Sequence, residues 1–169
     1  MGLIVKQHYI VVGFDPGLAD TGFGVIEVKG DKLTCLDYGS LRTPAKVDLT
    51  KRLCLLYYKA GEILSEYKPD LVGIEQLFFC RNVTTAFGVG QARGVVMLAI
   101  GQHSIPYLEF TPLQVKQAVV GYGQGSKQQV QRMVKLILNL KIIPKPDDAA
   151  DAIAIATEVL VSREKKIAV

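Results

Sequence analysis

Two acidic side chains of this sequence stand at positions where a carboxylate is costly to place. Asp15 ends an apolar, β-branched run that begins at Tyr9, and Glu75 is the only charge between the apolar runs 71–74 and 77–79. An ionised carboxylate without a partner is unfavourable in such surroundings. Each residue also has an interpretation that requires no function. Asp15 could cap a hairpin turn, and the side chain of Glu75 could point into solvent at a strand end.

A second pair of carboxylates lies near the C-terminus, in a segment that is apolar almost all round. Asp148 and Asp151 are three residues apart in this segment and share one face of a helix. That face continues with apolar residues: Ala152, Ile155 and Val159. An acidic residue in the first turn of a helix stabilises the helix through its dipole, and this could explain Asp148 without a function. Asp147 alone could supply that stabilisation, however, and Asp151 lies beyond the capping positions.

If the four carboxylates converge, their chemistry points to a metal site. The sequence places no Lys or Arg beside them, so we expect either raised pKa values or bound cations. Ligation by oxygen alone suits Mg²⁺ or Mn²⁺ rather than zinc. Two such ions, about 4 Å apart, stabilise the attacking and leaving oxygens of a phosphodiester. The acids therefore predict a nuclease.

The segments between the acids predict a mixed α/β domain. Three strands joined by short connections form an antiparallel meander, and two later strands follow helical crossovers and lie parallel to a neighbour. Capping residues mark several helix starts: Asp48, Thr111 followed by Pro112, and Ser126. The expected strands are 9–14, 22–28, 32–41, 71–74 and 106–110; helices are expected over 49–67, over 86–102, after 111, after 126 and from 147, with a loop over 76–85.

Composition places the chain in a broad class. Its 169 residues, 49% hydrophobic and 21% charged, fit one ordered domain spanning residues 1–169. No apolar run is long enough to span a bilayer, and the first residues do not resemble a signal peptide, so we expect a cytoplasmic protein. The three cysteines have no metal-ligand spacing and are expected to be reduced thiols. A net charge of +4 permits nucleic-acid binding without requiring it.

Five ordered motifs give the chain a specific resemblance. They are Gly13-Phe14-Asp15-Pro16-Gly17 with Thr21-Gly22, Ile74-Glu75-Gln76 with Phe78, Gly90-Gln91-Ala92-Arg93-Gly94, Gln114-Val115-Lys116-Gln117 with Val119-Val120-Gly121, and Asp148-Ala149-Ala150-Asp151-Ala152. Together they resemble the RuvC family of Holliday junction resolvases over nearly the whole chain. The resemblance implies a ribonuclease-H-like fold, in which a mixed five-stranded sheet is flanked by helices. It also implies a homodimer that makes paired, Mg²⁺-dependent nicks in two strands of like polarity at a four-way DNA junction. Mn²⁺ is expected to substitute, and the branch-migration proteins RuvA and RuvB are the implied partners.

The same resemblance assigns roles to individual residues. The family's four acidic positions, which are catalytic and hold the metal, map onto Asp15, Glu75, Asp148 and Asp151. Lys116 and Lys127 match basic positions that face DNA, and Phe78 matches an aromatic residue that meets bases at the junction centre. Each of these three has an alternative, as solvated lysines or a core phenylalanine. Arg93 is left open between a phosphate contact and an ion pair beneath its helix.

Two other classes of function compete with a junction nuclease. Phosphotransferases of the actin and sugar-kinase type also begin with a strand, an acidic residue and a glycine-containing turn. They close two such lobes over ATP, whereas this chain holds one copy and no internal repeat. A non-catalytic junction-binding protein is the other alternative. A complete set of acids argues against it, because binding a polyanion alone favours their loss.

Overall fold

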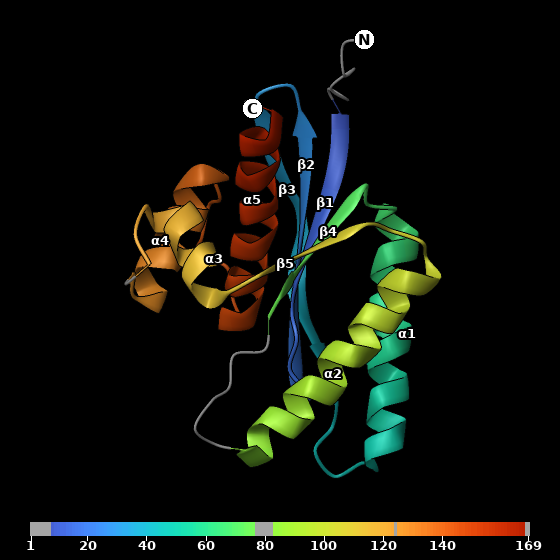
Figure 1. Ribbon diagram of the computed structural model, residues 1–169. Coiled ribbons are helices and arrows are strands. Elements are labelled where there is room, and N and C mark those ends of the chain that lie inside the picture. Colours follow the sequence, from blue (N-terminus) through green and yellow to red (C-terminus); the bar gives the residue numbers. More distant parts are fainter. Residues whose placement is uncertain (1–7, 77–82, 124, 168–169) are drawn as a thin grey trace.

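The computed structural model describes residues 8–76, 83–123 and 125–167, which form a five-stranded mixed sheet with helices on both faces (Figure 1). The strand order is β3-β2-β1-β4-β5. The first three strands pair antiparallel, and β4 and β5 are added parallel to β1. The strands are β1 (His8–Asp15), β2 (Asp20–Lys29), β3 (Lys32–Arg42), β4 (Leu71–Glu75) and β5 (Tyr107–Phe110). The predicted fold class is therefore confirmed.

The helices divide between the two faces of the sheet. In Figure 1, α1 and α2 lie on one side, while α5 runs along the other with α3 and α4 packed against it. The helices are α1 (Leu49–Tyr67), α2 (Val83–Gln102), α3 (Pro112–Val120), α4 (Lys127–Ile137) and α5 (Asp147–Ile167). Among the residues that the structure describes, no helix combines the length and hydropathy that a membrane span requires.

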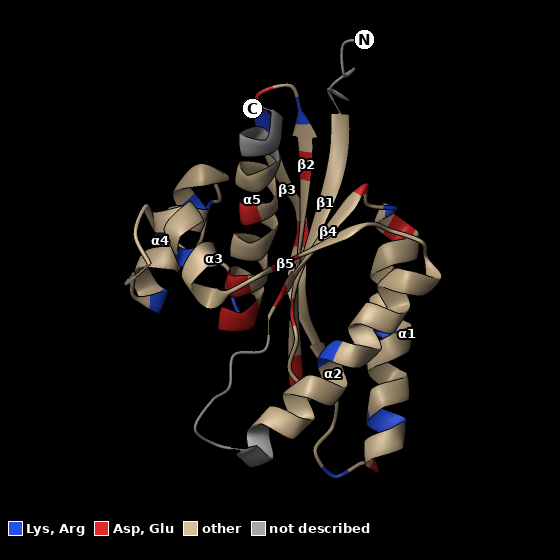
Figure 2. Cartoon of the chain, in the orientation of Figure 1, with Lys and Arg blue, Asp and Glu red and all other residues tan. Residues whose placement is uncertain are grey.

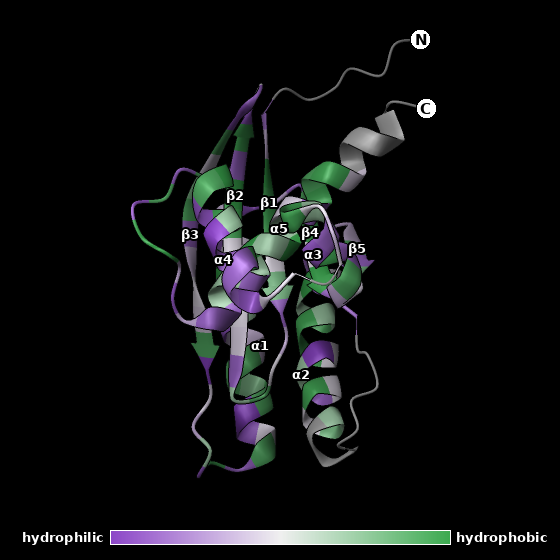
Figure 3. Cartoon of the chain, turned by 90° about the vertical axis from the view of Figure 1, so that its left-hand side faces the viewer, coloured by the Kyte–Doolittle hydropathy of each residue, from purple (hydrophilic) through white to green (hydrophobic). Residues whose placement is uncertain are grey.

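Side-chain alternation along the strands builds one apolar core on each face. Val11 is buried in the core beneath α5, and its neighbour Val12 is buried in the core beneath α1 and α2. This alternation follows from the period of two in a strand, and both faces of the central strand are covered. Figure 3 shows hydrophobic segments along both α1 and α2, and in α1 the buried residues Leu56, Ala60 and Leu64 recur at helical spacing and form one buried face.

Glycines in the central strands let α5 lie unusually close to the sheet. A Cβ atom at Gly22 would lie 2.0 Å from the carbonyl oxygen of Asp148, and one at Gly13 would lie 2.1 Å from that of Ala152. No real side chain tolerates such distances. The absence of a Cβ at these two positions therefore lets the start of α5 pack against the end of β1 and the start of β2.

The predicted helix starts are confirmed at their capping residues. Asp48 accepts a hydrogen bond from the backbone N–H of Thr50, and both Thr111 and Ser126 form complete capping boxes. One boundary was wrong: α2 begins at Val83, so residues 83–85 are helical and not part of the predicted loop. The β-branched residues there have low helix propensity, which the rest of this long helix overrides.

Candidate active site

Two of the predicted acids meet because their strands are parallel neighbours. Asp15 is the last residue of β1 and Glu75 the last residue of β4, and Phe14 pairs with Ile74 one position before them. The carboxyl ends of adjacent parallel strands lie at the same edge of a sheet, so the two half-buried side chains are brought together. A side-chain hydrogen bond joins Asp15 and Glu75.

The other two acids reach the same edge from the first turns of α5. Single carboxylate oxygens of Asp15, Asp148 and Asp151 all lie within 4.8 Å of one another. Figure 2 shows the acidic start of α5 beside the end of the sheet and beside basic segments of α3 and α4. The structure thus brings together all four acids that the sequence singled out. Their catalytic role stays a prediction.

Crowding of these carboxylates changes their affinity for protons. Burial raises the pKa of Asp15 to about 8, with further contributions from the charges of Glu75, Asp151 and Asp148. Burial also raises the pKa values of Glu75 and Asp151, although nearby lysines oppose the rise. Asp15 therefore holds its proton at neutral pH in the absence of a cation. A divalent cation would supply the missing positive charge.

The expectation that no basic residue lies beside the acids was wrong. Lys127, the first residue of α4, places its Nζ 3.0 Å from Oδ2 of Asp151 and 3.8 Å from Oδ2 of Asp147. The sequence predicted that α4 begins at this point, because Ser126 is a good capping residue. It did not reveal that α4 packs on α5 with its first turn against Asp151, since that is a tertiary relationship.

A pocket of about 230 Å³ opens beside the acids, between β4 and the helices α3, α4 and α5. Glu75 and Asp151 line one part of it, and Lys116 and Lys127 line another. The remaining lining residues are Pro112, Val115 and Val130. Both lysines predicted to face DNA therefore border the acids, although Lys127 is already paired with Asp151. Phe78, the third predicted DNA contact, lies outside the described residues.

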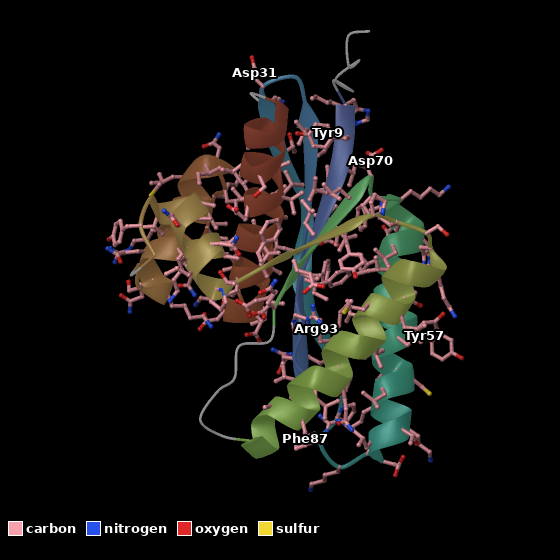
Figure 4. The ribbon with its side chains drawn as sticks, viewed as in Figure 1. Tyr9, Asp31, Tyr57, Asp70, Phe87 and Arg93 are labelled. Atoms are coloured by element: carbon pink, nitrogen blue, oxygen red, sulfur yellow. The ribbon has the colours of Figure 1, made fainter. Side chains whose placement is uncertain are left out.

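The structure shows the contacts of Arg93, whose role the sequence left undecided. Its Nε donates to the backbone carbonyl oxygen of Glu75 at 3.0 Å, and its Nη2 lies 2.7 Å from Oε2 of Glu109 on β5. The side chain is 16% exposed and lies between α2 and the sheet (Figure 4). The ion-pair alternative is thus confirmed, and the guanidinium fixes the strand end that carries Glu75.

Thr21 closes the turn that follows Asp15. Its side chain is fully buried, and its hydroxyl donates to the carbonyl oxygen of Gly17 at 2.7 Å while accepting from the Gly17 N–H at 3.2 Å. A hydroxyl bonded to both backbone groups of Gly17 fixes the path of the chain just past Asp15. The sequence showed a threonine in this turn but not its partner.

Known proteins match this chain over most of its length. The family model for crossover junction endodeoxyribonuclease RuvC matches residues 11–158. Crossover junction endodeoxyribonuclease RuvC of Desulfitobacterium hafniense (strain DSM 10664 / DCB-2) is 54% identical over 147 residues, covering 87% of this chain and 89% of the relative. Its counterpart from Thermomicrobium roseum is 52% identical over 146 residues, covering 86% of this chain and 89% of the relative.

A solved structure agrees with these matches. T. thermophilus RuvC in complex with Holliday junction substrate superimposes with a TM-score of 0.89 and 35% identity, covering 95% of this chain and 98% of that chain. The chain therefore belongs to the RuvC family of crossover junction endodeoxyribonucleases.

Proposed function

We propose that this protein resolves four-way DNA junctions by metal-dependent cleavage of two strands of like polarity, and that Asp15, Glu75, Asp148 and Asp151 are its catalytic residues. One observation carries the proposal: in a member of this nuclease family, single carboxylate oxygens of Asp15, Asp148 and Asp151 lie within 4.8 Å of one another, and Glu75 is hydrogen-bonded to Asp15. The resemblance to a RuvC structure that contains a Holliday junction substrate supports the choice of DNA substrate. Family membership favours a nuclease over the phosphotransferase alternative.

The donor set fits divalent cations, and we propose Mg²⁺ with Mn²⁺ as a substitute. Several carboxylate oxygens close together, with no described thiol or imidazole in the group, suit these hard cations. Two bound cations about 4 Å apart stabilise the attacking and leaving oxygens of a phosphodiester. A bound cation would supply the positive charge that favours the ionised form of Asp15. Asp15, Asp148 and Asp151 would hold the cations, and Glu75, which is hydrogen-bonded to Asp15, would supply a further carboxylate.

Neighbouring groups would orient the DNA. Lys116 lines the pocket beside Glu75, where an ammonium can contact a backbone phosphate next to the cleaved bond. Lys127 borders the same pocket and is proposed to reach phosphate as well. Phe78 is proposed to stack on unpaired bases at the junction centre, an interaction worth about 1–3 kcal/mol per base.

A homodimer supplies the second site that paired nicks require, because a two-fold junction needs two active sites related by a similar axis. We propose that the outer face of α2 forms the interface. Phe87 and Leu98 are 71% and 55% exposed on this face. Apart from the adjacent residues and the backbone of α2 itself, no atom of the described chain lies within 4 Å of where a Cβ would stand at Gly94 or Gly101, which share the face. Glycines there allow a second copy to approach closely.

Association with RuvA and RuvB and a cytoplasmic location belong to the same proposal.

The direct test of this function compares two DNA substrates. A synthetic four-way junction and a linear duplex of equal length are incubated with the protein and Mg²⁺. Symmetrically paired nicks in the junction, an intact duplex and loss of cutting in EDTA are the expected results. Equal cutting of both substrates would refute junction specificity, and cutting that persists in EDTA would refute the metal site.

A further inference from the structure

One basic side chain already lies against the acids that are proposed to hold metal. Lys127 reaches from the start of α4 to α5, where its ammonium lies 3.0 Å from Asp151 and 3.8 Å from Asp147. Asp151 is one of the three acids whose oxygens lie within 4.8 Å of one another. The ammonium therefore contacts a carboxylate that a divalent cation would also require.

The position of this ammonium is fixed by the fold. Ser126 accepts a hydrogen bond from the backbone N–H of Gln129 at 3.2 Å, and the Gln129 side chain accepts from the Ser126 N–H at 2.7 Å. This capping box holds the first turn of α4, and the buried side chain of Val130 packs that turn into the core beneath α5. Lys127 lies between the cap and Val130, so its backbone is fixed on both sides and its side chain lies close to Asp151.

The charges at this point reinforce the pairing. Partial burial lowers the pKa of Lys127, but the hydrogen bond to Asp151 and the charges of Asp151, Asp147 and Asp148 outweigh burial and raise it. The ion pair with Asp151 thus favours the charged form of Lys127. In turn it is the largest effect that opposes the burial-driven rise in the pKa of Asp151.

We propose that Lys127 is a tethered cation that competes with the divalent metal for Asp151. The ammonium compensates the acidic cluster in the metal-free protein and must leave Asp151 for the metal to bind with its full set of ligands. Lys127 thereby stabilises the metal-free fold and weakens metal binding. This inference rests on the proposed metal site, and it adds a function for Lys127 that requires no DNA.

Lys116 provides a matched control. It lines the same pocket and carries the same charge, and its charge acts on Glu75. Among the described residues, however, no ion pair within 4.0 Å connects it to an acid. Replacing either lysine with methionine removes one positive charge from the pocket and keeps most of the side-chain volume. Only Lys127→Met removes the ammonium from Asp151.

The experiment measures Mg²⁺ binding by isothermal titration calorimetry, without DNA, for the parent, Lys127→Met, Lys127→Arg and Lys116→Met. Lys127→Met should bind Mg²⁺ roughly tenfold more tightly, which is the lower end of what a hydrogen bond between charged groups contributes. Lys116→Met should change the affinity much less, and Lys127→Arg should stay near the parent because it keeps a cation beside Asp151.

Melting curves give a second readout. Lys127→Met should melt below the parent in EDTA and gain more Tm than the parent when Mg²⁺ is added.

The outcomes separate this inference from the metal site itself. An equal increase in Mg²⁺ affinity in Lys127→Met and Lys116→Met would show a general effect of charge. It would overturn the proposal that Lys127 competes with the metal for Asp151. Parental affinity in Lys127→Met would overturn it as well, while leaving the metal site in place. Failure of the parent to bind Mg²⁺ at all would instead remove the metal site on which the inference rests.

Discussion

The guanidinium of Arg93 and the backbone carbonyl oxygen of Glu75 are joined by a hydrogen bond of 3.0 Å. The same guanidinium pairs with Glu109 at 2.7 Å, so one side chain of α2 ties together the ends of β4 and β5. Glu75 therefore has its main chain fixed from α2 while its side chain lies among the acids. The helix proposed to form the dimer interface is in direct contact with the strand end that carries a proposed catalytic residue.

Arg93→Ala removes both bonds and leaves Glu109 without its partner. We expect the free energy of unfolding to fall by about 1.5–3 kcal/mol, the usual contribution of hydrogen bonds to charged groups. We also expect kcat for junction cleavage to fall more than KM rises, because Glu75 shifts while the DNA contacts remain. Arg93→Lys should recover only part of each loss, since lysine cannot make both bonds in the same geometry. Urea denaturation and steady-state cleavage provide the two measurements.

The control for Arg93 is Arg132→Ala, at an exposed arginine of α4. Its stability should stay within about 0.5 kcal/mol of the parent, as is usual for surface changes. If Arg93→Ala matched the stability and kcat of the parent, the proposed positioning role would be wrong.

Gly22→Ala should disturb the site through the backbone. A Cβ at Gly22 would lie 2.0 Å from the carbonyl oxygen of Asp148, so the start of α5 must move. Overpacking of this kind costs about 1–3 kcal/mol or more, and the displacement of Asp148 should weaken Mg²⁺ binding. Thermal melts and calorimetry measure the two effects.

Gly61→Ala is the matched control for Gly22. It lies within α1, and the nearest atom to its added Cβ would be Cε1 of His103 at an ordinary contact distance of 3.7 Å. This change should raise stability by up to about 1 kcal/mol, because alanine is the better helix former. Unchanged Mg²⁺ affinity in Gly22→Ala would contradict the argument that this glycine brings Asp148 to the site.

The metal-free protein should lose stability as pH rises from about 4 to about 8. The pKa of Asp15 is raised from 3.8 to about 8 in the folded protein, so the folded state binds more protons than the unfolded state in this range. The free energy of unfolding must then fall with increasing pH. Urea midpoints in EDTA at several pH values measure the slope. Asp15→Asn should flatten it, and an equally steep slope in that variant would contradict the assignment to Asp15.

Leu98→Glu should separate the proposed dimer without unfolding the protein. Leu98 is 55% exposed on the outer face of α2, so a glutamate there is tolerated by the fold but not by an apolar interface. Multi-angle light scattering should find a dimer for the parent and a monomer for the variant. Leu136→Glu, at a residue 70% exposed on α4, should remain dimeric. A Leu98→Glu protein that stays dimeric would place the interface elsewhere.

Local patterns predicted most of the fold. Apolar alternation located the strands within one or two residues, and side chains such as Asp48 and Ser126 marked helix starts, because capping depends on residues close in sequence. The four acids were found because each is out of place in an apolar run. These features are readable because their physical causes are local.

The contacts that the sequence did not reveal depend on long-range packing. The pairing of Lys127 with Asp151 arises where two helices cross, and the bond from Arg93 to Glu75 depends on the rotation of α2 over the sheet. The resemblance singled out Lys127 as a DNA contact and left Arg93 open between a phosphate contact and an ion pair. The partners that the structure gives them, Asp151 for Lys127 and Glu75 with Glu109 for Arg93, depend on the tertiary arrangement.

The central claim is that the clustered acids hold metal for DNA cleavage, and cleavage of a four-way junction by Asp15→Asn tests it most directly. The parent and Asp31→Asn should cut with Mg²⁺, since Asp31 lies on the exposed turn between β2 and β3, at the opposite end of the sheet from the site (Figure 4). Asp15→Asn should bind the junction, melt no earlier than the parent in EDTA because repulsion among the acids is relieved, and fail to cut. An Asp15→Asn protein that melts early in EDTA and still cuts at the parental rate would contradict the claim.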